Sequence, residues 1–82
     1  MGEKTKKLCE IVSGKLVQVH SVSGGGAIKR RLLELGFVPN AVLKVLNVSP
    51  FGKAFLIDCV GSVVALRLNV AGLINVVEIL GE

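Results

Sequence analysis

The sequence predicts a mainly β fold: a small, closed or partly closed β-barrel of about five strands with one added α-helix near residues 27–35. Three observations support this fold class. The chain has 82 residues, enough for one compact core. Its apolar residues occur in short alternating runs that glycine and proline separate. A single glycine-flanked segment instead has the apolar spacing of a helix.

The predicted helix follows three consecutive glycines and ends at Gly36. Ile28, Leu32 and Leu35 stand at positions i, i+4 and i+7, so they share one side of the helix. We expect apolar neighbours to cover that side. Gly36 can adopt the positive φ that ends a helix, and Pro39 prevents the helix from continuing.

The remaining elements are predicted in chain order. Residues 1–7 are polar and charged, so we expect a flexible basic tail followed by a single domain over residues 8–82, which opens with a helical turn over residues 8–14. Gly61-Ser62 predicts a two-residue type II′ hairpin, and Asn69 is expected to cap a helical turn over residues 70–73. The five strands are expected at residues 15–22, 41–48, 54–60, 63–68 and 74–80.

The alternation predicts apolar side chains on both sides of the sheet. The inward side is expected to hold Leu43, Val45, Phe55, Ile57, Cys59, Val64 and Leu66. The opposite side then carries Val42, Leu46, Val48, Leu56, Val60 and Val63, interrupted by Lys44, Asp58 and Arg67. A barrel of this size has no second core to cover them, and a contiguous apolar surface typically marks an interface. We therefore expect this side to bind a partner protein, and we expect self-association at high concentration.

The net charge of +4 is concentrated near the N-terminus, because residues 1–31 carry +5 and residues 32–82 carry −1. A basic segment is typical of chains that bind nucleic acid or an anionic membrane, but in a small apolar domain a solubilising tail is the favoured interpretation. The chain has three phenylalanines and no tryptophan or tyrosine, so few side chains could stack on nucleic-acid bases. No nucleic-acid partner is therefore expected. Lys29 and Arg30 of the helix are candidate contacts for a protein partner.

Residues suited to catalysis or metal binding are few and scattered. Cys9 and Cys59 lie fifty positions apart, which is neither a zinc-binding nor a redox spacing. His20 is the sole histidine. It could meet a thiol or a nearby carboxylate in the fold, so a metal-binding barrel stays open as an alternative. We expect no catalytic residue, no cofactor and no enzymatic activity.

Other features narrow the function further. The three glycines before the helix lack the Lys-Ser/Thr pair of a Walker phosphate loop. Charged residues interrupt every apolar run before the roughly 18 residues that a membrane helix needs, and no signal peptide is recognisable, so we expect a cytoplasmic location. Phe51 stands at the tip of a turn. It either folds back onto the mouth of the barrel or offers a hydrophobic contact to a partner.

Five short motifs, taken together, resemble the FeoA family of small proteins of bacterial ferrous iron uptake. They cover residues 8–80. The motifs are Leu8-x-x-Ile11-x-x-Gly14, the helix and its glycine stop through Pro39, Ser49-Pro50-Phe51-Gly52, Gly61-x-x-Val64-Ala65-Leu66-Arg67, and Ile74-x-Val76. The chain departs from the family pattern at Asn40, where glycine is usual, and at Lys53-Ala54, where Asp-Pro is common.

The resemblance implies an SH3-like barrel with an added helix. It also implies an accessory role for FeoB, the large inner-membrane ferrous iron transporter with a cytoplasmic nucleotide-hydrolysing domain. Binding FeoB would recruit the protein to the inner face of the cell membrane. A similar barrel forms the C-terminal domain of DtxR-type iron-dependent repressors. The alternative function is therefore a regulatory barrel that binds ferrous iron or another divalent metal.

Overall fold

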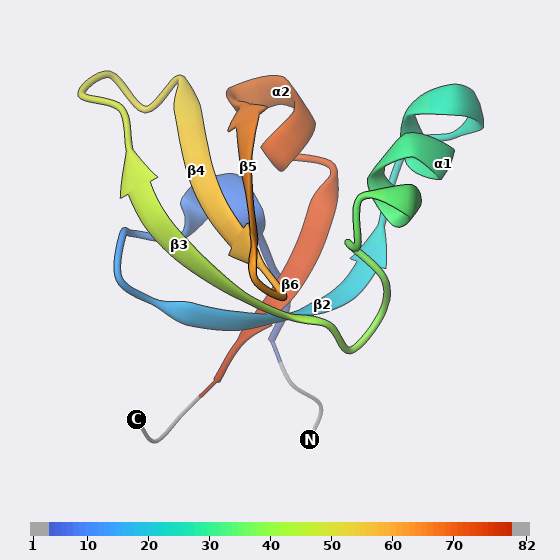
Figure 1. Cartoon of the computed structure of the whole chain (residues 1–82), viewed down its shortest axis with the longest axis horizontal. Coiled ribbons are helices and arrows are strands. Elements are labelled where there is room, and N and C mark those ends of the chain that lie inside the picture. The colour runs from blue at the N-terminus through green and yellow to red at the C-terminus, as the bar shows by residue number, and fades with distance from the viewer. Residues whose placement is uncertain (1–3, 80–82) are drawn as a thin grey trace.

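The computed structural model describes residues 4–79, and within them six antiparallel strands form one strongly curved sheet (Figure 1). The strands lie side by side in the order β1-β6-β2-β3-β4-β5. The mainly β class with one added helix is confirmed. The strands are β1 (Lys6–Lys7), β2 (Leu16–Val22), β3 (Val42–Val48), β4 (Ala54–Cys59), β5 (Ser62–Arg67) and β6 (Ile74–Glu78). The helical elements are η1 (Leu8–Glu10), α1 (Gly26–Glu34) and α2 (Leu68–Ala71).

Short helices complete the barrel between the two edges of the sheet. In the part of the chain that the structure describes, β1 and β5 are the terminal strands of the sheet order. The helix α2 packs against β4, β5 and η1, and η1 in turn packs against β6. Leu8 of η1 and Ala71 of α2 are fully buried. The barrel is thus closed by helical turns and side-chain packing where strand pairing stops.

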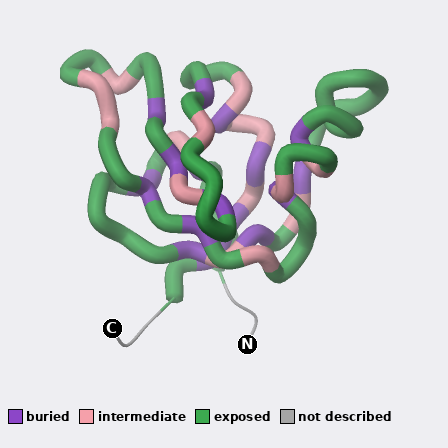
Figure 2. Tube along the Cα trace, in the orientation of Figure 1, coloured by how far each residue is buried: buried purple, intermediate pink, exposed green. Residues whose placement is uncertain are grey.

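The core is formed by inward-facing strand residues, which lie inside the curved sheet (Figure 2). All seven residues predicted to face inward do so: six are buried, and Val64 is half-buried against the core. No buried side chain among residues 4–79 is polar or charged. Hydrophobic burial is therefore the main source of stability. The largest fully buried side chains are Phe37, Leu8, Leu43, Ile57, Ile74, Val17, Val19, Val45 and Val76.

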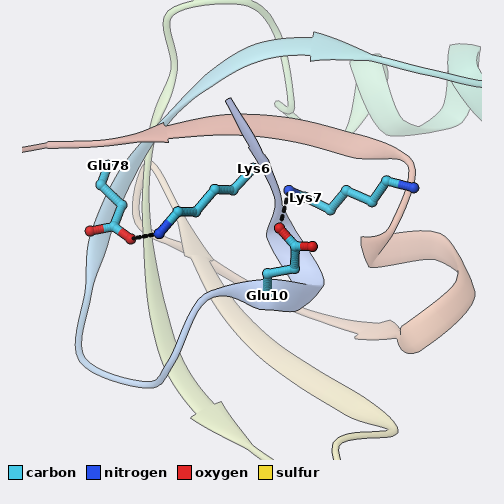
Figure 3. A network of polar contacts seen from close by, with 4 residues as sticks. All are labelled: Lys6, Lys7, Glu10 and Glu78. Atoms are coloured by element: carbon cyan, nitrogen blue, oxygen red, sulfur yellow. Dashed lines mark hydrogen bonds and ion pairs between the residues drawn. The ribbon is translucent and has the colours of Figure 1, made fainter. Parts of the chain in front are cut away.

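The sheet begins earlier than the sequence predicts, because Lys6 and Lys7 pair with Val76 and Asn75 of β6. The predicted flexible tail is therefore wrong for these two lysines. Their backbone groups instead continue the β6 ladder while their side chains stay in water. Figure 3 shows the Lys6 Nζ–Glu78 Oε2 ion pair at 2.9 Å and the Lys7 N–H donating to Glu10 Oε1 at 3.1 Å.

The Lys6–Glu78 ion pair makes a pH-dependent contribution to stability. The hydrogen bond and charge of Lys6 hold the pKa of the Glu78 carboxyl below its usual value, and Glu78 raises the pKa of Lys6. Because the pKa of Glu78 is lowered by folding, its contribution is present above the unfolded-state pKa and is lost as pH falls through the folded-state pKa.

We expect Lys6→Met to lower the urea midpoint slightly at pH 7, since both side chains are solvent-exposed and the interaction is screened. The difference from the unmodified chain should vanish at about pH 2, where the carboxylate is protonated. Urea titrations at the two pH values measure this, with Lys29→Met on α1 as the control. An equal difference at both pH values would contradict the assignment.

The helix α1 ends as the sequence predicts. Gly36 has a φ of +112°, and its N–H donates to the Leu33 carbonyl at 3.1 Å. The Phe37 N–H donates to the Leu32 carbonyl at 3.0 Å. These two bonds form a Schellman motif, in which the residue after the glycine packs against the last turn. Leu32 and Phe37 are accordingly both buried in the core.

The predicted burial of α1 is largely wrong. Of its three apolar residues at helical spacing, only Leu32 is buried, whereas Ile28 is 39% exposed and Leu35 is 41% exposed. Figure 1 shows the reason: α1 stands beside the barrel and meets it near the helix C-terminus. Periodicity identifies residues on a common side of a helix, but it does not say how much of that side meets the core.

Two predicted turn details are also wrong. Cys59 pairs with Ser62, so the β4–β5 hairpin turns at Val60 and Gly61, with φ of +53° and +89°. Two positive φ values define a type I′ turn in place of the expected type II′. The helix α2 begins at Leu68, with Arg67 as its N-cap residue, so Asn69 lies inside the helix and does not cap it.

Candidate functional site

The exposed side of strands β2 to β5 is the candidate site, and we call it the outer strand face. Lys44 of β3 lies opposite Asp58 of β4, and Asp58 lies opposite Val63 of β5. Leu56 lies between Asn47 and Ala65. Aliphatic and polar side chains thus lie next to each other on this face. The outer strand face comprises Leu16, Val42, Lys44, Leu46, Asn47, Leu56, Asp58, Val63 and Ala65.

The predicted outward aliphatic residues are exposed with one exception. Val42 is 46% exposed, Leu56 38% and Val63 59%, and Leu46 is similarly accessible. No part of the described chain buries these side chains. Leu16 and Ala65 also belong to this face, although the sequence did not single them out. Each is next in sequence to an inward-facing residue, Val17 or Leu66, so the alternation of a strand could have identified both as outward-facing.

Val48 is the exception, and its predicted outward position is wrong. The pairing of β3 with β4 shifts between Val45 and Asn47, so Leu46 is the extra residue of a β-bulge. Beyond the bulge, Val48 lies opposite the buried Phe55 and packs against the core. A one-residue shift moves every later side chain to the other side of the sheet.

Val60 stands at one end of the outer strand face, at the tip of the β4–β5 hairpin. Its side chain is 78% exposed and its φ is positive, which is unfavourable for a β-branched residue. The Gly61 N–H donates to Asp58 Oδ1 at 3.0 Å, which fixes the turn beside the carboxylate. Strained backbone positions cluster at functional sites, so Val60 stays a candidate contact residue.

Shallow hollows run along the outer strand face. One of about 230 Å³ is lined by Leu16, Val42, Lys44, Asp58 and Val60 among others. Another of about 180 Å³ lies beside Asn47, Leu56 and Ala65. Such hollows suit individual side chains of a protein partner, because small-molecule sites are usually larger and more enclosed.

A basic hollow of about 750 Å³ lies at the opposite end of β4 and β5 from the hairpin tip, lined by Lys53, Ala54, Arg67, Leu68 and Asn69. Lys53 belongs to the turn that carries Phe51. The Phe51 side chain is 86% exposed, so the expectation that it folds back onto the barrel is wrong. Its alternative role as a hydrophobic contact for a partner stays a prediction.

Lys29 and Arg30 are exposed on α1. Figure 1 shows α1 beside the barrel and apart from strands β4 and β5. The structure therefore does not bring these two cations together with the aliphatic residues of the outer strand face. They form a separate candidate contact.

The residues considered for metal binding are not gathered into one site. His20 is the extra residue of a bulge in β2, with Nδ1 3.3 Å from Ser21 Oγ. Cys9 is half-buried and Cys59 is buried. Within residues 4–79, no group of three or more histidine, cysteine or carboxylate side chains could hold a metal ion.

The two thiols are expected to differ in reactivity. Desolvation, with a further contribution from the charge of Asp58, raises the pKa of the Cys59 thiol. Since the thiolate is the reactive form, we expect Cys9 to be alkylated by iodoacetamide well before Cys59 at pH 8. Mass spectrometry of a time course measures the order, and full unfolding in urea should equalise the two rates. Faster labelling of Cys59 in the folded protein would contradict this expectation.

No helix in the described part of the chain is long and apolar enough to span a membrane. The family model of the FeoA domain matches residues 6–78. No curated protein matches the chain.

Several solved structures share this fold. FeoA from Chlorobium tepidum is 38% identical, with a TM-score of 0.85, and the match covers 94% of this chain and 73% of that one. FeoA from Stenotrophomonas maltophilia in complex with zinc is 31% identical, with a TM-score of 0.78 over 87% of this chain and 88% of that one. That protein is described as an SH3 domain protein and a candidate activating factor of ferrous iron transport.

A manganese-dependent transcriptional repressor has a TM-score of 0.86 at 20% identity, over 96% of this chain and 44% of that one, a likeness in fold alone. The SH3-like fold expected from the sequence is confirmed by the relative so described. Because the family model covers nearly all of the described barrel, the chain belongs to the FeoA family, whose small domains are associated with ferrous iron transport.

Proposed function

We propose that this protein is a non-enzymatic accessory protein of bacterial ferrous iron uptake that binds the FeoB transporter through its outer strand face. The observation that supports this is the set of exposed aliphatic residues on β3 to β5, which the described chain leaves uncovered. The similarity to a relative described as a candidate activating factor of ferrous iron transport gives independent support for a role in ferrous iron uptake.

The composition of the face suits a protein partner. Aliphatic side chains gain about 25 cal/mol per Å² of apolar surface when a partner covers them. Lys44 and Asp58 lie opposite each other within this surface. Charged groups at such positions favour a complementary partner and disfavour others. A face of this kind suits the binding and positioning of a partner.

The proposal includes a location. FeoB presents its nucleotide-hydrolysing domain to the cytoplasm, so a protein that binds there works in the cytoplasm at the inner face of the membrane. Lys29 and Arg30 on α1 provide a second contact in this arrangement, to the partner or to anionic lipid headgroups.

The experiment compares two aspartate substitutions in binding to the purified cytoplasmic portion of FeoB and to the full-length transporter in detergent. Leu56→Asp should weaken binding at least about tenfold, because it places a charge at the centre of the apolar face. Val38→Asp, in the loop between α1 and β3, is the matched control, since the two side chains are similarly exposed, at 38% and 42%, and Val38 belongs neither to the outer strand face nor to α1. It should bind as the unmodified chain does.

Two outcomes would overturn the proposal. One is no binding of the unmodified chain to either form of the transporter. The other is loss of binding in Val38→Asp but not in Leu56→Asp, which would move the contact away from the outer strand face.

The alternative function, a metal-binding regulatory barrel, is supported by the likeness in fold to repressors. Within the described residues, the geometry offers it no gathered ligand set. Anaerobic titration with ferrous iron, monitored by calorimetry, distinguishes the two functions. Stoichiometric binding in the absence of a partner would favour the alternative.

A further inference from the structure

The strand β5 (Ser62–Arg67) forms one edge of the sheet. It is the last strand in the sheet order, and in the described part of the chain it pairs with β4 alone. Ser62, Val63 and Ala65 are exposed. Apart from the pairing with β4, no backbone hydrogen bond within the described residues involves residues 62–65, so the other edge of this segment carries unpaired backbone groups.

The hairpin geometry identifies those groups. The turn residues are Val60 and Gly61, so Cys59 and Ser62 form the hydrogen-bonded pair that closes a two-residue loop. Hydrogen-bonded and non-hydrogen-bonded pairs alternate along an antiparallel ladder. Val63 and Ala65 fall in the non-hydrogen-bonded pairs with β4. Their N–H and C=O groups consequently point away from β4, along the free edge.

The two edges of the sheet differ in how they are protected. The β1 edge is two residues long and consists of Lys6 and Lys7. Short length and lysine are the usual means by which proteins prevent edge-to-edge pairing. The β5 edge has six residues, of which only the last, Arg67, is charged, and none of them is a proline. Such an edge is a template for another strand.

We propose that two copies of this chain associate by antiparallel pairing of β5 with β5 about a two-fold axis beside Val64. In this register Val63 of one copy lies opposite Ala65 of the other, and each such pair exchanges two backbone hydrogen bonds. The sheet continues from one copy into the next. This inference does not depend on the proposed binding of FeoB.

Charge favours this register. Arg67 of one copy comes opposite Gly61 of the other, whose N–H is bonded to the Asp58 carboxylate at 3.0 Å. Arg67 and Asp58 both lie on the outer side of the sheet, and neither has an ion-pair partner within the described residues. The two-fold axis brings the guanidinium of each copy towards the carboxylate of the other at both ends of the interface. A second copy therefore matches the edge in backbone groups, in side-chain polarity and in charge.

The pairing has a consequence for the outer strand face. A two-fold axis perpendicular to the sheet keeps both outer strand faces on one side of the dimer. Covering the β5 edge thus leaves those faces exposed, and together they present a wider surface.

The experiment measures the dimer dissociation constant by sedimentation equilibrium from micromolar to millimolar protein. Ala65→Pro removes an edge-facing N–H that β4 does not use, and Val63→Lys adds the protection that β1 has. Each should raise the dissociation constant at least about tenfold while circular dichroism shows a folded monomer. Leu56→Lys is the control, because it places the same charge on the same face one strand away from the edge. It should change the constant by less than about threefold.

Hydrogen exchange provides a direct readout. The amides of Val63 and Ala65 should become protected as the concentration rises, whereas the amide of Val60 in the turn should not. A monomer at millimolar concentration would overturn the proposal. So would equal weakening by Leu56→Lys and Val63→Lys, since the copies would then meet through their faces. Concentration-independent exchange at Val63 and Ala65 in a dimer would also overturn it.

Discussion

Replacing Gly36 by alanine is expected to lower the free energy of unfolding by roughly 2–4 kcal/mol. Two separate effects contribute. The φ of +112° is unfavourable for any residue with a Cβ atom, at a cost of about 1–2 kcal/mol. A Cβ at this position would also lie 2.9 Å from Cys59 Sγ, which is too close without movement of the buried thiol. Urea denaturation followed by circular dichroism measures the change.

Gly14 provides the matched control for Gly36. Its φ is +91°, yet a Cβ there would meet no atom within 4 Å. We expect Gly14→Ala to cost only the backbone term, about 1–2 kcal/mol. Combining Gly36→Ala with Cys59→Ala should cost less than the sum of the single changes, because the two atoms no longer collide. Equal destabilisation by Gly14→Ala and Gly36→Ala, with additive double-mutant energies, would show that the contact with Cys59 contributes nothing.

Replacing Phe37 by alanine should have the largest effect of any single substitution, at about 3–5 kcal/mol. Phe37 is fully buried and is the largest such side chain. It also joins the C-terminal turn of α1 to the barrel core through the Schellman motif. Since domains of this size have about 5–15 kcal/mol of total stability, the variant should lose more than about 10 °C in Tm.

The same substitution at the exposed Phe51 is the matched control for Phe37→Ala. Because its side chain is 86% exposed, Phe51→Ala should change the free energy of unfolding by less than about 0.5 kcal/mol. Thermal unfolding by calorimetry compares the two variants. A Phe37→Ala protein as stable as Phe51→Ala would mean that the core closes over the missing ring without leaving a cavity.

The inward residues of the sheet could be predicted from the sequence because a strand has a fixed period of two. Leu43, Val45, Phe55 and Ile57 follow that period without interruption. Val48 was not predicted, since it lies beyond the bulge at Leu46. The available signal was Asn47, because uninterrupted alternation would place this polar residue on the inward side with Val45. The inward or outward position of a side chain is thus predictable only as far as the next irregularity in the ladder.

Other features required tertiary information. The glycine stop of α1 is local, and it was predicted, whereas the exposure of Ile28 and Leu35 depends on where the helix stands relative to the barrel. The positive φ of Val60 was not predicted either, because valine is among the residues least suited to it. Cross-strand pairing of Cys59 with Ser62 imposes that conformation.

The outer strand face was partly predictable for the same reason as the core. Leu56 stands between the buried Phe55 and Ile57, and Val63 precedes the half-buried Val64, so their exposure follows from the period. The separation of Lys29 and Arg30 from that face follows from the position of α1, which the sequence does not specify. The position of Asp58 beside the hairpin turn likewise depends on the register of the paired strands β4 and β5.

The adjacency of β1 and β6 has a consequence for how such a domain is used in longer chains. Lys6 lies opposite Val76, so the incoming and outgoing segments of the described barrel run side by side. A domain with neighbouring ends can be joined to another polypeptide, or inserted into one of its surface loops, without stretching either connection. A circularly permuted version, with the ends linked and a new opening in the Phe51 turn, should fold into the same barrel.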